Sequence, residues 1–236
     1  QWLRLMARNF TPHTQIVLGY SGYERGKGWL HKRISFNTLF TSLRYLGFAL
    51  AGKPYMGLGR NLAYRKELFF KQKGYSTHLN LQRGEDDLFI NQIANTENTR
   101  VETNARAIMR MQPIERYKDW KEERVSYMAT ARYYKGAQRY LLGFETCSRL
   151  LFYMACIAGI VFGIIHSHWL VAGIAFFIWL LRYTVQAIVI NKTATDQEEN
   201  RHYYFSLLLF DLLQPLQTLQ FKLYRLYRGK GDFMRR

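Results

Sequence analysis

The sequence predicts an α/β domain followed by a helical hairpin that crosses a membrane. Residues 1 to 140 mix charged, aromatic and turn-forming residues, as a soluble domain does, whereas most uninterrupted apolar residues lie after Leu150. The stretches Leu150 to Ile165 and Trp169 to Leu181 contain no charged residue. With the residues beside them, both approach the roughly 20 apolar residues that a membrane-spanning helix needs. The two parts of the chain are therefore expected to meet different solvents.

In the soluble part, strand and helix patterns alternate. Ile16 to Tyr20 is a short apolar run that predicts a buried strand, and the glycine-rich stretch Ser21 to Lys32 predicts a loop. From Phe36 to Leu50 the apolar residues recur at helical spacing. This segment is expected to be a helix that packs one face on the core and ends near Gly52.

Shorter elements are expected to complete the domain. Tyr55 to Tyr64 contains two glycines and predicts an extended segment that approaches a ligand or another backbone. Arg65 to Lys73 and Asp86 to Asn95 predict short helices. Arg106 to Met111 predicts an edge strand.

The remaining chain is expected to lie at or in a membrane. Tyr117 to Phe144 is rich in arginine, lysine and tyrosine, which suits a helix along a membrane surface. The two spans are joined by His166-Ser167-His168. Tyr203 to Phe221 is broken by Asp211 and Pro215, which favours an interfacial helix over a third span. We divide the chain into an α/β domain, an interfacial helical segment, a transmembrane hairpin and a basic amphipathic C-terminal segment: residues 1–116, 117–147, 148–190 and 191–236.

The net charge points to an anionic partner. The chain has 34 lysines and arginines against 17 aspartates and glutamates, a formal charge of +17. The basic residues crowd around the hairpin, in residues 132–149, 182–192 and 222–236. This placement favours anionic membrane lipids as partner and predicts that both outer ends of the hairpin lie in the cytosol. No nucleic-acid-binding motif is found, and nucleic acid is not expected as a partner.

Two turns carry the residues most suited to chemistry. The first is glycine-rich and contains Gly59-Arg60-Asn61, and the second places Glu85-Asp86-Asp87 directly after Gly84 at the start of an apolar helix. A helix N-terminus favours carboxylates by roughly 0.3 to 1 kcal/mol, which is a purely structural explanation for the acidic turn. A carboxylate within hydrogen-bond reach of a hydroxyl group is also a general base.

The order of these features resembles that of the membrane-bound family-two glycosyltransferases, which have a GT-A fold. The chain has the glycine-rich Arg-Asn turn, the acidic turn, Trp120 followed by Arg124, and then the apolar hairpin. The resemblance implies an inverting transfer of sugar in which Asp86 is the base and Glu85 lies beside it. Asp87 is then either a supporting residue or the base in a shifted register.

The resemblance also assigns residues to the substrates. The turn at Gly59 would lie beside the donor sugar and the acceptor, with Arg60 near phosphate and Asn61 near a sugar hydroxyl. A purely structural turn is the alternative for either residue. Trp120 and Arg124 occupy the place where processive relatives carry Gln-x-x-Arg-Trp, and only the arginine matches. Arg124 is therefore expected to pair with the donor pyrophosphate, and Trp120 to stack on sugar or lie at the membrane surface. We expect one or few sugars to be added.

The family holds Mg²⁺ or Mn²⁺ with an Asp-x-Asp motif, and this sequence contains no Asp-x-Asp. Cys147 and Cys156 are the only cysteines, and no residue spacing predicts another metal site. The chain is therefore expected to be the acceptor-side part of a GT-A domain, inactive without the metal-binding part of the full-length enzyme.

The resemblance implies transfer from a nucleotide sugar to a lipid-linked or envelope glycan acceptor. The enzyme would be a multi-pass protein of the inner (plasma) membrane with its catalytic part in the cytosol. The alternative function is a non-enzymatic membrane anchor or scaffold whose soluble domain binds a partner. Both functions are compatible with a transmembrane hairpin, and only the acidic and glycine-rich turns favour the enzyme.

Overall fold

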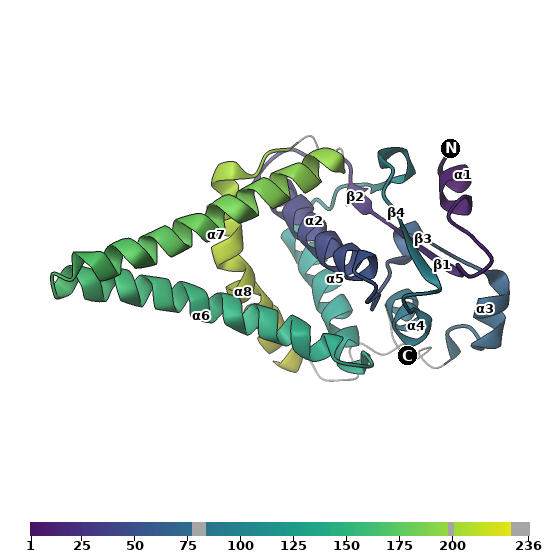
Figure 1. Cartoon of the computed structure of the whole chain (residues 1–236). Coiled ribbons are helices and arrows are strands. Elements are labelled where there is room, and N and C mark those ends of the chain that lie inside the picture. The colour runs from purple at the N-terminus through teal and green to yellow at the C-terminus, as the bar shows by residue number, and fades with distance from the viewer. Residues whose placement is uncertain (77–83, 198–200, 228–236) are drawn as a thin grey trace.

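The computed structural model describes residues 1–76, 84–197 and 201–227. A domain with a small sheet occupies one end, and a long pair of helices projects from it as a narrow V (Figure 1). Arg83 of the acidic turn and residues 228–236 of the basic tail lie outside the described residues. The structure is 68% helical, with a small mixed sheet and two long apolar helices, so it fits the predicted α/β domain and hairpin only loosely.

The sheet is built on the strand that the apolar run predicts. β1 (Ile16–Gly19) is buried along its whole length and pairs on both edges. It is antiparallel to β3 (Leu62–Tyr64) and parallel to β4 (Thr99–Glu102). β2 (Ser21–Tyr23) follows almost directly and pairs in parallel with β5 (Met109–Met111). The segment predicted as a strand from Arg106 thus becomes a short strand after a 3-10 turn, η3 (Ala105–Ala107).

Helices pack around this sheet. They are α1 (Trp2–Ala7), α2 (Trp29–Leu50), α3 (Lys66–Lys71) and α4 (Glu85–Ile93). α2 starts earlier than predicted, because Gly28, at φ +93°, turns the chain and the helix begins at the next residue. The apolar residues of α2 and α4, among them Leu39 and Leu88, are buried in one core with Leu18 of β1. The predicted core face of α2 is therefore confirmed.

The predicted interfacial segment 117–147 is divided between different elements. α5 (Tyr117–Thr130) is followed by a 3-10 turn, η4 (Ala131–Tyr133), and α6 (Gln138–Ile165) then runs without a break into the apolar stretch. α5 buries Trp120 and Val125 against other parts of the protein. This helix is therefore a core element of the domain, because its apolar side chains find protein partners.

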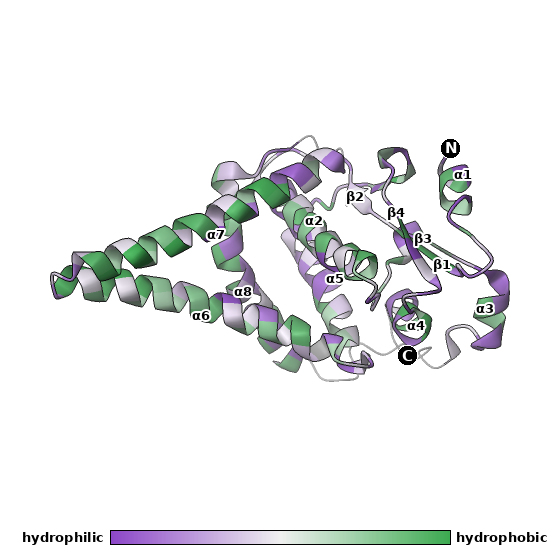
Figure 2. Ribbon diagram, in the orientation of Figure 1, coloured by the Kyte–Doolittle hydropathy of each residue, from purple (hydrophilic) through white to green (hydrophobic). Residues whose placement is uncertain are grey.

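The hairpin is formed as predicted. α6 and α7 (Trp169–Asp196) leave only residues 166 to 168 between them. Both helices are long and apolar enough to cross a membrane, and only 17% and 11% of their most apolar windows are buried. Figure 2 shows hydrophobic residues along both arms of the V. A core helix of a soluble protein would be mostly covered, so the exposed apolar surface indicates association with a membrane.

The third apolar segment forms one helix, α8 (Tyr204–Tyr227), which crosses the open end of the V (Figure 1). The expected helix over this segment is present, and Asp211 and Pro215, which interrupt its apolar sequence, are both buried. Leucines recur every three or four residues on its exposed side, namely Leu208, Leu212, Leu216, Leu219 and Leu223. The inner face packs on the protein through apolar and polar residues, and the exposed leucine face suits a helix at a membrane surface.

A buried carboxylate fixes α8 to the hairpin. Asp211 accepts hydrogen bonds from Arg149 of α6, at 2.9 Å, and from Arg182 of α7, at 3.1 Å. Tyr153 of α6 also donates to it. Because the aspartate lies between two cations, its charge is compensated although it is buried. Asp211 thus has the structural role of joining three helices.

The hairpin geometry generates a prediction about topology. Cysteines are introduced singly as Ser167→Cys in the turn and Thr195→Cys near the end of α7, in a background with Cys147→Ser and Cys156→Ala. Both positions are exposed. We expect an impermeant thiol reagent to label the two from opposite sides of the membrane, because one span separates them. Labelling of both from the same side would reject a transmembrane hairpin.

Candidate functional site

A cavity of about 140 Å³ lies between α2, the segment after Pro54, the start of α4 and α5. Of the residues predicted from the sequence, it is lined by Arg60, Asp87, Trp120 and Arg124. These residues come from three separate segments of the chain. The folded structure therefore brings the glycine-rich turn, the acidic turn and the Trp-Arg segment to one place.

Asp86 contacts the glycine-rich turn directly. Its carboxylate accepts a hydrogen bond from the backbone N–H of Gly59. A Cβ atom at Gly59 would lie 2.7 Å from the Asp86 Oδ2 atom, so this approach needs a residue without a side chain. Asp86 and Glu85 are both half-buried, and neither lines the cavity itself. Asp86 is thus held at the edge of the site with part of its surface accessible.

Gly84 determines where α4 begins. It has φ +89°, a left-handed conformation that other residues adopt only with strain, and it forms the N-cap of α4. A Cβ atom here would also come within 2.2 Å of the Thr130 methyl group. Glycine is therefore required on two grounds, and the close approach places the acidic turn against the end of α5.

Asp87 is directed into the protein. Its buried carboxylate accepts hydrogen bonds from the Tyr134 hydroxyl, at 2.6 Å, and from the Thr130 hydroxyl, at 3.0 Å. Burial raises the pKa of Asp87 to about 7, the nearby Asp86 adds to the rise, and the two hydrogen bonds oppose it. Asp87 therefore ties α4 to the end of α5, while Asp86 is the more accessible of the two carboxylates.

Arg60 is engaged by α5. Its guanidinium forms an ion pair with Glu123 and donates to the hydroxyl of Tyr23 at 3.2 Å. The Tyr23 hydroxyl in turn donates to Glu123 at 3.1 Å, and burial raises the pKa of Tyr23 to about 12. The charge of Arg60 is thus largely balanced within the protein. A phosphate would have to compete with Glu123 for this guanidinium.

Asn61 is a structural residue. Its buried amide donates to the carbonyl groups of Tyr20, at 2.6 Å, and Ala107, at 2.9 Å, and accepts from the Trp2 indole at 2.9 Å. The side chain also fills the space above Gly19, where a Cβ atom would lie 2.5 Å from it. These contacts leave no accessible group for the predicted sugar hydroxyl, so Asn61 instead joins the chain between β1 and β2 and the η3 turn to α1.

Trp120 is also part of the protein interior. Only 2% of its surface is exposed, and it packs with Val125 and with Phe221 of α8, at a ring distance of 5.9 Å. The ring was predicted to stack on a sugar or to lie at the membrane surface. It lies in the core instead. The indole packs on Phe221 of α8, and the sequence pattern did not indicate that α8 lies against α5.

Arg124 lines this cavity and a neighbouring one. Within the described ranges its side chain makes no hydrogen bond or ion pair with another residue, and its Nε atom is buried without a partner. Burial and the positive charge of Arg44 together lower the pKa of Arg124 to about 10, and the nearby Glu123 opposes the shift. A desolvated cation that no ion pair within the described residues engages favours the binding of an anion.

The sequence analysis missed several lining residues, among them Glu123 and Tyr127 of α5. Together with Trp120 and Arg124 they recur at intervals of three and four residues. This spacing places them near one helix face, a signal that was available from the sequence. Arg44 was missed because α2 was interpreted only as a core helix.

No group of three or more His, Cys, Asp or Glu side chains that could hold a metal ion occurs in residues 1–76, 84–197 and 201–227. These residues do not fit the Mg²⁺ or Mn²⁺ site of the family that the sequence resembles. No chemical step is therefore assigned to a metal.

The raised pKa of Asp87 generates a prediction about stability. Between about pH 4 and pH 7 the unfolded chain releases this proton while the folded chain retains it, so folding becomes less favourable as pH rises through that window. Asp87→Asn keeps an acceptor for Tyr134 and Thr130 and cannot ionise. We expect it to become more stable relative to wild type from pH 4 to pH 7, by on the order of a few kcal/mol. The measurement is thermal unfolding in detergent; a constant difference between the two proteins would contradict the buried, titrating carboxyl group.

No family model matches the chain, and no curated protein or solved structure is significantly similar to it. The resemblance to family-two glycosyltransferases stays a prediction. What the site can do is therefore inferred from its own residues: an accessible carboxylate at a glycine-rich turn, beside a cavity with an unpaired arginine.

Proposed function

We propose that this chain is the acceptor-side part of an inverting glycosyltransferase that works at a membrane surface. The observation that carries the proposal is the position of Asp86. It is the accessible carboxylate of the acidic turn, it contacts Gly59, and the adjacent cavity contains Arg124. A base beside a cationic cavity is what transfer from a nucleotide sugar requires.

In the proposed reaction the acceptor hydroxyl oxygen attacks the anomeric carbon of the donor sugar. The hydroxyl proton passes to the Asp86 carboxylate, and the bond between the anomeric carbon and the phosphate oxygen breaks. The electron pair of that bond stays on the nucleoside diphosphate, which leaves. A fixed positive charge near the leaving group stabilises the negative charge that develops there, and Arg124 is the residue proposed to supply it.

Other residues have positioning roles. The Asp87 contacts with Tyr134 and Thr130 hold α4 and therefore the base. Arg60 remains a proposed phosphate contact, with Glu123 as its partner in the absence of substrate. The acceptor is proposed to be lipid-linked or an envelope glycan, and the exposed apolar surfaces of α6, α7 and α8 support a site next to a membrane.

The proposed location is the inner (plasma) membrane, with the domain in the cytosol. Basic residues near both domain ends of the hairpin, such as Arg149 and Lys192, support this orientation. The nucleotide-sugar donors of such reactions would then meet the site on the cytosolic side.

The test is Asp86→Asn in the intact protein, assayed in detergent with a panel of nucleotide sugars. We expect turnover to fall by roughly 100-fold, the scale of general-base catalysis, with donor affinity nearly unchanged. Asparagine keeps the size of the side chain and an oxygen for the Gly59 N–H, so the structure should persist.

The matched control is Glu67→Gln, which removes an exposed carboxylate from the first turn of α3 and should leave turnover unchanged. Full activity in Asp86→Asn together with lost activity in a folded Asp87→Asn would move the base to Asp87. Absence of sugar transfer with every donor would favour the non-enzymatic anchor.

A further inference from the structure

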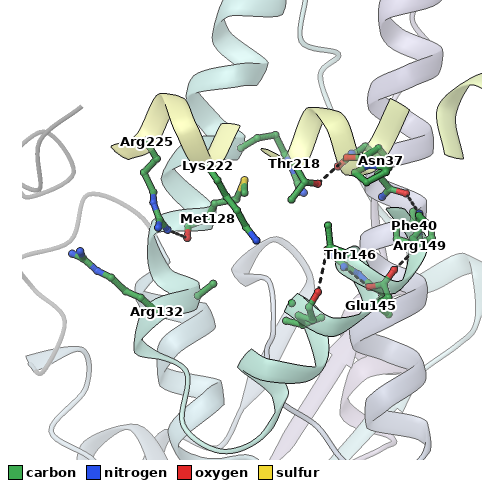
Figure 3. Close-up of a pocket in the computed structure, with 17 residues that line it drawn as sticks. Asn37, Phe40, Met128, Arg132, Glu145, Thr146, Arg149, Thr218, Lys222 and Arg225 are labelled. Atoms are coloured by element: carbon green, nitrogen blue, oxygen red, sulfur yellow. Dashed lines mark hydrogen bonds and ion pairs between the residues drawn. The ribbon is translucent and has the colours of Figure 1, made fainter. Parts of the chain in front are cut away.

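A second cavity, of about 300 Å³, lies between α2, α5, α6 and α8. Its lining is strongly cationic and contains one carboxylate, Glu145. The basic residues that line it are Arg44, Arg124, Arg132, Arg149, Lys222 and Arg225. Figure 3 shows Lys222 reaching from α8 into the middle of this space.

Internal ion pairs account for only part of this charge. Glu145 is shared by Arg44, at 2.9 Å, and Arg149, and the latter also pairs with Asp211. Arg225 donates to the backbone carbonyl of Met128 at 2.8 Å and has no carboxylate partner in the part of the chain that the structure describes. Lys222 and Arg124 are likewise without an acidic partner there. The cavity therefore retains a positive charge that an anion would balance.

The position of the cavity indicates where that anion comes from. The apolar stretch of α6 that could span a membrane begins at Tyr140, and the lining residues Leu142 to Arg149 lie in its first turns. Cationic side chains at this level of a membrane helix face the headgroups.

Exposed apolar side chains border the lining residues. Phe144 of α6 is next to Glu145 in the chain and is 71% exposed, and Leu219 and Leu223 of α8 flank Lys222 and are about half exposed. A ligand with a phosphate in the cavity and hydrocarbon outside it would satisfy both surfaces. A free phosphate would leave the apolar surface uncovered.

We propose that this cavity binds the phosphate group of a membrane lipid headgroup. Lys222 and Arg225 would donate charge-assisted hydrogen bonds to the phosphate oxygens. The bound headgroup would neutralise the cavity and fasten α8 to the membrane surface. This inference concerns a different cavity from the candidate catalytic site and stands whether or not the chain transfers sugar.

The test measures lipid retention by the whole chain in detergent, by native mass spectrometry with phosphatidic acid or phosphatidylcholine. We expect the wild type to retain phosphatidic acid preferentially, and Lys222→Gln to weaken this retention about tenfold, the effect of losing one charge-assisted hydrogen bond. Lys222 is exposed, so its replacement should not disturb folding, and the unfolding temperature verifies this.

The control is Lys192→Gln, which removes an exposed lysine at the domain end of α7, outside this cavity. Retention within about twofold of wild type is expected, since only distant charge is lost. Equal losses in the two variants would mean non-specific attraction to the basic surface and would overturn the proposal. Unchanged retention in Lys222→Gln would overturn it too. Displacement of the lipid by inorganic phosphate at comparable concentration would assign the cavity to a soluble phosphate compound instead.

Discussion

A chain of ion pairs, buried at Asp211 and partly exposed at Glu145 and Arg44, holds the domain to the hairpin, and it borders the larger cavity. Asp211 of α8 contacts Arg149 of α6, Arg149 contacts Glu145, and Glu145 contacts Arg44 of α2. The first and last of these pairs join helices that are far apart in the sequence, and the middle pair links them within one turn of α6. Breaking a buried pair by removing one partner costs about 3 to 5 kcal/mol, because the other charge is left without compensation. The position of α8 is therefore strongly specified.

This network has a consequence for the cavities. Glu145 and Asp211 are both engaged in its ion pairs, Glu145 with Arg44 and Asp211 with Arg149 and Arg182. The remaining cations face the two cavities, and Arg124 lies between them. Among the described residues, Arg124, Lys222 and Arg225 are thus left without a carboxylate partner where an anionic ligand can reach them.

The neighbouring carboxylates of the acidic turn lie in different environments. Asp87 is buried and held by two hydroxyl groups, whereas Asp86 meets the Gly59 backbone at the edge of the site. Gly59 and Gly84 make this possible because any side chain there would collide with Asp86 or Thr130. A structural and a reactive role are thereby available to adjacent residues of the same helix turn.

The sequence by itself determined the elements whose pattern is local. The apolar run of β1, the periodic face of α2, the short helix at the acidic turn and the hairpin with its turn at residues 166 to 168 all follow from residue spacing and hydrophobicity. It also identified the segments that meet at the cavity.

Only the tertiary structure decided what individual polar and aromatic residues do. Asn61 and Trp120 are residue types that often bind sugars, but here they hold the fold together. Their partners, Trp2 and Phe221, lie far away in the chain, so the sequence pattern did not reveal these contacts. α8 continues through Asp211 and Pro215 because Arg149 and Arg182 compensate the buried charge. Such contacts join residues that no local pattern relates, and they decide whether a side chain is buried, paired or left accessible to a ligand.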